Sequence, residues 1–319
     1  MNYKCASFFA GVGGIDLGFE NAGFDVVFAN EIDKNAAETF RANFPNTNLM
    51  VKDIRQLDEK SEIPDFNIMI AGFPCQAFSI AGYRQGFNDE KGRGNLFFDL
   101  LRIIDEKEPG VVFLENVKNL FTHDERKTYA RIEQELTDRG YDVTPMVLNA
   151  AEYGNVPQAR ERIYIICFKN KEQSEKFHML KPVKLEKTIK DLIDFNKKQD
   201  DKFYYNENCK FYDQLVTDVT KSDTCYQWRR KYVRENKSKL CPTLTANMGT
   251  GGHNVPIIKN HSGDIRKLTP RECFNLQGYP SDYVLPANQS NTSLYKQAGN
   301  SVVVTVIERL ANNIMDAIS

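Results

Sequence analysis

Short apolar segments alternate with segments of helical periodicity over the first 170 residues, and this alternation constrains the fold more than any other feature. Strands are expected at residues 5–10, 25–29, 66–71, 111–114, 141–148 and 162–168, and helices at 15–21, 34–43, 96–106 and 125–138. Strands that alternate with helices of about 10–15 residues form parallel sheets with helices on both faces. We therefore predict an α/β fold with a doubly wound, mostly parallel sheet.

The chain changes character after about residue 170. It becomes polar, rich in Lys, Asn and Asp, and is broken by short β-branched or aromatic pieces, so a second, smaller, irregular β-containing domain is expected. Helical spacing returns at 301–318, which should pack on the first domain. We predict a first domain of residues 1–180 plus 295–319 and a second domain of residues 181–294.

Charge is unevenly distributed between these parts. Residues 171–270 hold 20 Lys and Arg against 13 Asp and Glu, a net charge of +7, whereas the whole chain has a net charge of −1. A basic segment beside an acidic body suggests a polyanionic partner on one side. With 41% hydrophobic and 27% charged residues the chain is of globular type, and no apolar run reaches the roughly 20 residues of a membrane span. A soluble cytoplasmic protein without a membrane partner is expected.

The seven cysteines are expected to be free thiols. Their number is odd, and no two of them have the Cys-x-x-Cys spacing of a zinc site. No metal site is predicted.

A glycine loop and two acids follow consecutive predicted strands. The loop is FFAGVGG at residues 8–14, Glu31 ends the second strand, and Asp53 precedes the third strand–helix unit. Glycines at such a turn let the backbone approach a ligand, and an acid there accepts hydrogen bonds from a ribose. The pattern is not Gly-x-Gly-x-x-Gly, so it indicates an adenosine pocket for either a dinucleotide or another adenosyl ligand.

A second group of residues suggests covalent chemistry. Cys75 follows the strand 66–71 and Glu115 ends the strand 111–114, while Arg160 and Arg162 face the same way on an extended segment. None of the four histidines lies at a predicted strand end, which disfavours a Cys–His protease. A thiol, an acid and an arginine suit conjugate addition to an electron-poor ring.

Eight motifs in a fixed order make the sequence resemble the DNA (cytosine-5) methyltransferases of bacterial restriction–modification systems. The resemblance covers nearly the whole chain. The motifs are FFAGVGG at 8–14, Asn30-Glu31, Asp53-Ile54, Pro74-Cys75-Gln76, Glu115-Asn116-Val117, Gln158-x-Arg160-x-Arg162, the segment 266–280, and the segment 297–302.

The resemblance implies a fold, a cofactor and its binding residues. The fold is that of S-adenosylmethionine-dependent methyltransferases, and the cofactor is S-adenosyl-L-methionine, with S-adenosyl-L-homocysteine as product. Phe9 would stack on the adenine, Glu31 would bind the ribose and Asp53 the adenine amino group. The implied cofactor-binding residues are Phe9, Gly11, Gly13, Gly14, Glu31, Ile32, Asp53, Ile54, Pro74 and Asn300.

The resemblance also assigns catalytic roles. Cys75 would attack C6 of a cytosine, Glu115 would act at N3, and Arg162 would bind O2. Asn116 would brace the turn at Pro74, and Arg160 would support the phosphate or the closed loop. A cytosine inside a duplex hides C6, so the base must be flipped out.

Double-stranded DNA is the implied partner, in a bacterial cell where the protein acts on the nucleoid. The residues expected to contact DNA lie in the loop after Cys75 and in the basic second domain: Gln76, Ser79, Arg84, Arg93, Arg229, Arg230, Arg234, Thr243, Leu244, Thr245, Asn247, Gly251 and Gly252. A monomer is expected. A cognate restriction endonuclease would act on the same site without direct contact.

Three alternatives remain open from the sequence. A transfer-RNA cytosine-5 methyltransferase would share the catalytic motifs, but its Cys-Phe-Thr motif is absent. A non-catalytic DNA-binding protein could keep the fold, although Cys75, Glu115 and Arg162 are intact. An unrelated adenosine-dependent enzyme would leave Pro74-Cys75-Gln76 unexplained.

Overall fold

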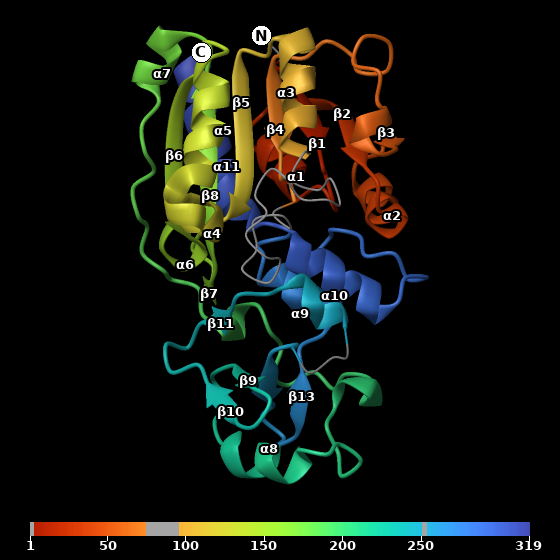
Figure 1. Cartoon of the computed structure of the whole chain (residues 1–319). Helices are drawn as coiled ribbons and strands as arrows, with labels where there is room; N and C mark the ends of the chain where they lie inside the picture. Colours follow the sequence, from red (N-terminus) through yellow and green to blue (C-terminus); the bar gives the residue numbers. More distant parts are fainter. Residues whose placement is uncertain (1–2, 75–95, 251–253) are drawn as a thin grey trace. The chain divides into compact units, whose positions relative to one another are not determined.

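The computed structural model describes residues 3–74, 96–250 and 254–319, and these residues divide into two compact units (Figure 1). Unit 1 comprises residues 1–148, 161–181 and 306–319, and unit 2 comprises 149–160 and 182–305. The expected division placed residues 149–160 and 295–305 with the first domain, whereas here they lie in unit 2.

The reason for this difference is local pairing within unit 2. β7 (Gln158–Ala159) forms a two-stranded parallel sheet with β11 (Cys241–Pro242). α10 (Asn291–Asn300) packs against the short helix η7 (Ala246–Gly249) so closely that a β-carbon at Gly299 would lie 2.1 Å from the Thr245 carbonyl carbon. Only glycine permits this approach.

A seven-stranded sheet with the order β3-β2-β1-β4-β5-β8-β6 forms the centre of unit 1. The pairs β1–β2, β2–β3, β1–β4 and β4–β5 are parallel, and β5–β8 is antiparallel. The prediction of a doubly wound, mostly parallel sheet is confirmed. Its elements are β1 (Lys4–Phe8), α1 (Gly14–Asn21), β2 (Asp25–Glu31), α2 (Lys34–Asn43), β3 (Asn48–Val51), β4 (Ile68–Ala71), α3 (Leu96–Lys107), β5 (Val111–Val117), α4 (Asn119–Thr122), α5 (Lys127–Thr137), β6 (Asp142–Asn149), β8 (Glu161–Phe168), α7 (Lys171–Lys176) and α11 (Val304–Ile318).

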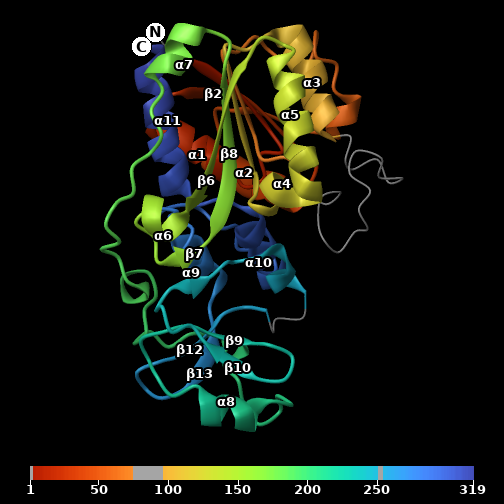
Figure 2. The same ribbon diagram turned by 60° about the vertical axis from the view of Figure 1, so that its left-hand side comes forward.

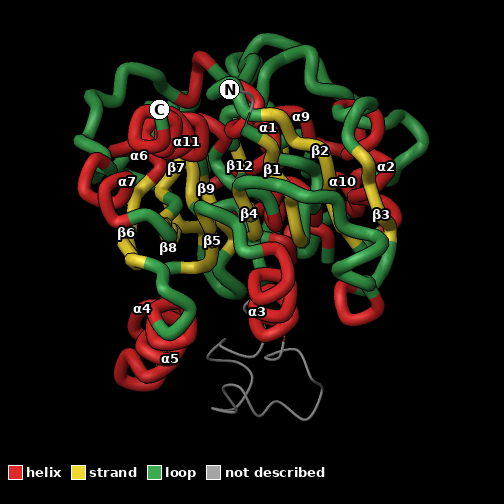
Figure 3. Tube along the Cα trace, turned by 90° about the horizontal axis from the view of Figure 1, so that it is seen from above, coloured by secondary structure: helices red, strands yellow, loops and turns green. Residues whose placement is uncertain are grey.

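Helices cover both faces of this sheet. α1 and α11 lie on one face, and α3 and α5 lie on the other (Figures 2 and 3). Leu100, Ile103, Ile132 and Leu136 from α3 and α5 are fully buried in a core shared with the sheet. The apolar residues whose periodic spacing predicts these helices from the sequence therefore form the surface that packs on the sheet.

The strand order places four loops at one edge of the sheet. The chain runs outward from β1 through β2 to β3, then returns to β4 and continues to β5 on the other side of β1. In open α/β sheets, ligands bind outside the carboxyl ends of the strands at such a switch point. The FFAGVGG motif starts at the last residue of β1, and Pro74-Cys75-Gln76 follows β4. Asn30-Glu31 and Glu115-Asn116-Val117 form the carboxyl ends of β2 and β5.

Unit 2 is built around a four-stranded sheet with the order β10-β9-β12-β13, in which neighbouring strands are antiparallel. Its small core contains Leu215, Val219, Tyr226, Ile257 and Ile265. Further elements of unit 2 are α6 (Ala150–Tyr153), α8 (Tyr212–Asp218), β9 (Tyr226–Trp228), β10 (Val233–Glu235), β12 (Ile257–Lys259), β13 (Ile265–Lys267) and α9 (Pro270–Asn275).

A buried ion pair joins β13 to α9 within unit 2. Arg266 Nη2 lies 2.7 Å from Glu272 Oε1, and both side chains are nearly inaccessible to solvent. Thr269 caps α9 in a capping box with Glu272. The segment 266–280 therefore contains a buried ion pair that stabilises the junction of β13 and α9 within unit 2.

Candidate active site

Glu31 ties the glycine loop to the end of β2. Its Oε1 accepts hydrogen bonds from the backbone N–H groups of Ile32 (2.8 Å) and Asp33 (2.7 Å), and its Oε2 accepts one from Gly11 (2.7 Å). A carboxylate has about four acceptor positions, so Oε2 keeps one for a further donor. The acid thus fixes the loop and still offers an acceptor, as a ribose site requires.

The loop itself depends on glycine at residue 13. Gly13 has φ +79°, and a β-carbon there would lie 2.2 Å from the ring of Phe44. Gly14 starts α1, and Phe9 is a half-buried residue with φ 56° whose ring packs against the core. The predicted cofactor residues Phe9, Gly11, Gly13 and Gly14 therefore lie in one turn between β1 and α1.

Ile32, Asp53 and Ile54 follow β2 and β3 in unit 1. The Ile32 side chain is 61% exposed, which is unusual for a large aliphatic residue and leaves an apolar surface beside Glu31. The carboxylate of Asp53 caps the short helix 54–56 and forms an ion pair with Arg55 (2.5 Å), and this pairing lowers the pKa of Asp53. Ile54 is buried.

Glu115 and Arg162 form an ion pair on adjacent strands. Because Val117 lies opposite Arg162 in the β5–β8 register, Glu115 is the diagonal neighbour of Arg162 on the same face. Arg162 Nε lies 3.2 Å from Glu115 Oε1, and both side chains are largely buried. A β-carbon at Gly72, just after β4, would lie 3.5 Å from Glu115 Oε2. The carboxylate therefore faces the loop that leads to Cys75.

Asn116 holds the start of that loop. Its Nδ2 donates a hydrogen bond to the Phe73 carbonyl (2.9 Å), and its Oδ1 accepts one from the N–H of Val117 (2.8 Å). This amide links the end of β5 to the backbone next to Pro74. Cys75, Gln76, Ser79, Arg84 and Arg93 lie outside the described residues.

Arg160 and Asn300 belong to unit 2. Arg160 is buried, and its guanidinium donates hydrogen bonds to the backbone carbonyls of Leu244 (2.7 Å), Gly299 (3.3 Å) and Ser301. These contacts tie three segments of unit 2 together, which is a structural role. Asn300 is an exposed residue at the end of α10.

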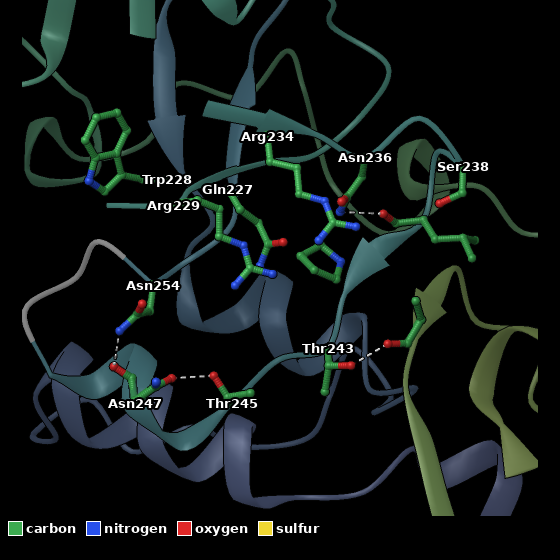
Figure 4. Close-up of a pocket in the computed structure, with 13 residues that line it drawn as sticks. Gln227, Trp228, Arg229, Arg234, Asn236, Ser238, Thr243, Thr245, Asn247 and Asn254 are labelled. Atoms are coloured by element: carbon green, nitrogen blue, oxygen red, sulfur yellow. Dashed lines mark hydrogen bonds between the residues drawn. The ribbon is translucent and has the colours of Figure 1, made fainter. Parts of the chain in front are cut away.

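The predicted DNA-contacting residues of unit 2 differ in exposure. Arg229, Arg230 and Arg234 are exposed, whereas the Leu244 side chain is fully buried. Gly251 and Gly252 lie outside the described residues. A polar pocket of about 430 Å³ is lined by Ala159, Gln227, Trp228, Arg229, Arg234, Asn236, Ser238, Leu240, Pro242, Thr243, Thr245, Asn247 and Asn254 (Figure 4).

Several site residues were not singled out from the sequence. Asn236 and Ser238 enter the pocket only because the chain folds back after β10, and nothing in their sequence context marks them. Gly72, two residues before Pro74, belongs to the Cys75 segment that the sequence does single out. Among the described residues there is no cluster of His, Cys, Asp and Glu able to hold a metal ion, and no helix both long and apolar enough to cross a membrane.

Asp16 is a buried acid in the first turn of α1, directly after the glycine loop. Neither carboxyl oxygen has a well-formed hydrogen bond to a described residue, although the nearby Ser7 hydroxyl favours the ionised form. Burial outweighs this contribution and raises the pKa of Asp16 to about 7. The group is therefore largely neutral in the folded protein at acidic pH.

Compared with the wild type, the Asp16→Asn variant is expected to have an increasingly large free energy of unfolding as pH rises. In the unfolded chain the carboxyl ionises near pH 3.9, so the folded wild type loses up to about 4 kcal/mol of stability between pH 4 and 7, and the amide variant does not. Urea unfolding of both proteins at pH 5 and pH 8 measures this difference. Asp65→Asn, at a side chain that is 99% exposed, is the control. If the difference in unfolding free energy between Asp16→Asn and the wild type is the same at pH 5 and pH 8, the raised pKa of Asp16 is contradicted.

The sequence comparisons decide the family. The family of C-5 cytosine-specific DNA methylases matches residues 3–316. The chain belongs to the C-5 cytosine-specific DNA methylases. It is 58% identical to the Type II methyltransferase M.Bsp6I of Bacillus sp. (strain RFL6), over 98% of both chains. It is 39% identical to the Type II methyltransferase M.HhaI of Haemophilus parahaemolyticus, over 96% of this chain and 92% of that one.

Solved structures support the same fold at lower identity. Dnmt2 methyltransferase of S. pombe superposes with a TM-score of 0.77 at 19% identity, covering 100% of both chains. A Spodoptera frugiperda DNMT2 mutant superposes with a TM-score of 0.76 at 22% identity, covering 98% of this chain and 100% of that one. With its family established, the chain is a DNA cytosine-5 methyltransferase of the Type II restriction–modification class, and its substrate is DNA.

Proposed function

We propose that the protein transfers a methyl group from S-adenosylmethionine to C5 of one cytosine in a short double-stranded DNA sequence, through a flipped-out base and a covalent Cys75–C6 bond. The observation that carries the proposal is the Glu115–Arg162 pair, with Oε2 of the carboxylate next to Gly72 at the start of the Cys75 loop. An acid and a guanidinium on adjacent strands match the N3 and O2 atoms of one cytosine edge.

The reaction follows from the weak nucleophilicity of cytosine C5. A Cys75 thiolate forms a bond to C6, and a hydrogen bond or proton from Glu115 at N3 stabilises the electron density displaced into the ring. Arg162 holds O2 and keeps the Glu115 carboxyl in place. When the methyl group has been accepted at C5, a base removes the C5 proton, the C5–C6 double bond forms again, and the Cys75–C6 bond breaks.

The residues predicted to bind the cofactor suit S-adenosylmethionine, and all of them except Asn300 belong to unit 1. S-adenosylmethionine supplies an electrophilic methyl group on a sulfonium. The acceptor left on Glu31 Oε2 suits a ribose hydroxyl, and the exposed Ile32 side chain offers an apolar surface for the adenine. Phe9 would cover the ring, Asp53 would accept from the adenine amino group, and Pro74 and Asn300 would approach the amino-acid end.

Glu31→Gln is expected to weaken S-adenosylmethionine binding by roughly 10- to 100-fold, because an amide has one acceptor oxygen and cannot accept all three backbone N–H groups and a ribose hydroxyl. Calorimetric titration of the cofactor measures the change. Glu106→Gln, at an exposed residue of α3, is the matched control and should bind normally. Equal affinity in the Glu31 variant and wild type contradicts the ribose assignment.

The function is tested by transfer of labelled methyl from S-adenosylmethionine to unmethylated genomic DNA and, separately, to bulk transfer RNA, followed by bisulfite sequencing. We expect label in DNA at one cytosine of a short recurring sequence. Label only in RNA would contradict the proposal and favour the transfer-RNA reaction. No label in either, with the cofactor bound, would favour a non-catalytic protein.

The wider role follows from the same proposal. Methylation of every copy of a short site protects host DNA against an endonuclease that cuts there, and such an endonuclease needs no contact with this chain. A monomer suffices, since one active site can treat each strand of a palindromic target in turn.

A further inference from the structure

The β9–β10 hairpin presents two chemically different faces. Val233 lies opposite Trp228, and Arg234 lies opposite Gln227. Directly opposed residues point to the same face, so Trp228 and Val233 face the core of unit 2, whereas Gln227 and Arg234 face the other way. Trp228 and Val233 do pack against that core. Arg229, two residues after Gln227, starts on the polar face as well.

The apolar face fixes the hairpin in position. The Trp228 ring stacks on Phe211, with centroids 4.3 Å apart and planes 9° apart. Phe211 precedes α8 directly, and Tyr226 is fully buried in the same core. The polar face is therefore held on a rigid support, which is what a specific recognition site needs.

The polar face borders the pocket, and Gln227, Arg229 and Arg234 project from the hairpin toward the segment that carries Thr243 and Thr245 (Figure 4). Across the pocket two threonine hydroxyls already donate hydrogen bonds within the protein: Thr243 donates to the Ala159 carbonyl, and Thr245 donates to Asn247 Oδ1. Within the described part of the chain, the side chains of Gln227, Arg229 and Arg234 form no hydrogen bond or ion pair, so their donors are available.

Two exposed guanidiniums and an amide on one face of a β-ribbon suit the edges of base pairs. The major groove admits a two-stranded β-ribbon, and an arginine fork matches the O6 and N7 acceptors of guanine. Arg230 has φ 60° in the turn after β9, and neither it nor Lys231 lines the pocket. Cations at the tip of such a ribbon suit phosphates, which position the protein without specifying sequence.

We infer that Arg229 and Arg234 read guanines of the target, and that Arg230 and Lys231 contact only the phosphate backbone. This inference rests on the proposed function. It separates the basic residues of the hairpin into two classes that the sequence alone treats as equivalent.

The inference is tested with a pool of DNA duplexes of random sequence, methylated by wild type, Arg234→Ala, Arg234→Lys, Arg229→Ala or Arg230→Ala and analysed by bisulfite sequencing. For Arg234→Ala we expect the preference for guanine over the other bases at one position of the target to fall about 10- to 100-fold, with the preferences at the other positions unchanged. Arg234→Lys keeps the charge but loses the fork, so it should show the same loss with an unchanged salt dependence. Arg229→Ala should relax the requirement for guanine at a different position of the target.

Arg230→Ala is the matched control from the same turn. It should keep the wild-type target, weaken binding for all sequences alike, and reduce the slope of log affinity against log salt by about 1. An unchanged target in Arg234→Ala and Arg234→Lys, with a reduced salt slope in Arg234→Ala, overturns the inference and makes Arg234 a phosphate contact. If wild type methylates no DNA, the proposed function fails and the inference fails with it.

Discussion

Cys75→Ser is expected to lower the rate of methyl transfer by on the order of 10⁴-fold or more. A serine hydroxyl is far less acidic and less nucleophilic than a thiol, so the bond to C6 does not form and C5 is not activated. Specific DNA binding should remain measurable, because the recognition residues lie elsewhere. Methyl transfer and DNA binding by the variant, measured on the same duplex, separate the two effects.

Cys209→Ser is the control for general effects of a lost thiol. Cys209 is a partly exposed free cysteine in unit 2, and its replacement should leave the rate of methyl transfer unchanged. Full activity in Cys75→Ser would remove the nucleophile from the mechanism.

Glu115→Gln is expected to lower the rate by roughly 10²- to 10⁴-fold. The amide cannot give a proton to N3, and it loses the charge that pairs with Arg162 at 3.2 Å. Binding of S-adenosylmethionine should stay near normal, because Glu31 and the glycine loop are unaffected. Single-turnover measurement of methyl transfer, with the cofactor at saturation, isolates the chemical step.

Glu161→Gln is the matched control for this substitution. Glu161 begins β8, next to Arg162, and its half-exposed carboxylate pairs with Lys118 at 2.9 Å. It should retain the wild-type rate, since exposed ion pairs contribute little. Equal rates for Glu115→Gln and wild type would show that N3 needs no acid.

The fold of unit 1 was predictable because its strands and helices are periodic and buried. Helices α1 and α2 occur at the predicted residues to within one position. β3 was not predicted, since it lies at the edge of the sheet, where Asn48 is exposed and the other three residues are only partly buried, and it lacks a clear apolar run. The antiparallel β5–β8 pair was also not predicted, because strand direction depends on the connection rather than on composition.

The organisation of unit 2 was less predictable because it depends on contacts distant in sequence. Gln158 pairs with Cys241, and Arg160 binds the Leu244 carbonyl, 84 positions further along the chain. The composition of residues 171–270 indicates a basic, irregular segment, but composition does not show that residues 149–160 belong to the same unit. The faces of the β9–β10 hairpin likewise follow from strand register, which three-residue strands do not reveal by periodicity.

The central claim is the covalent bond between Cys75 and cytosine C6, and trapping that bond tests it most directly. Fluorine in place of hydrogen at C5 of the target cytosine leaves no proton to remove, so the reaction stops after methyl transfer. We predict a protein–DNA complex that survives denaturation, requires S-adenosylmethionine, and gives a DNA adduct on the peptide containing Cys75. Attachment at another residue, or free methylated DNA without a complex, would contradict the account.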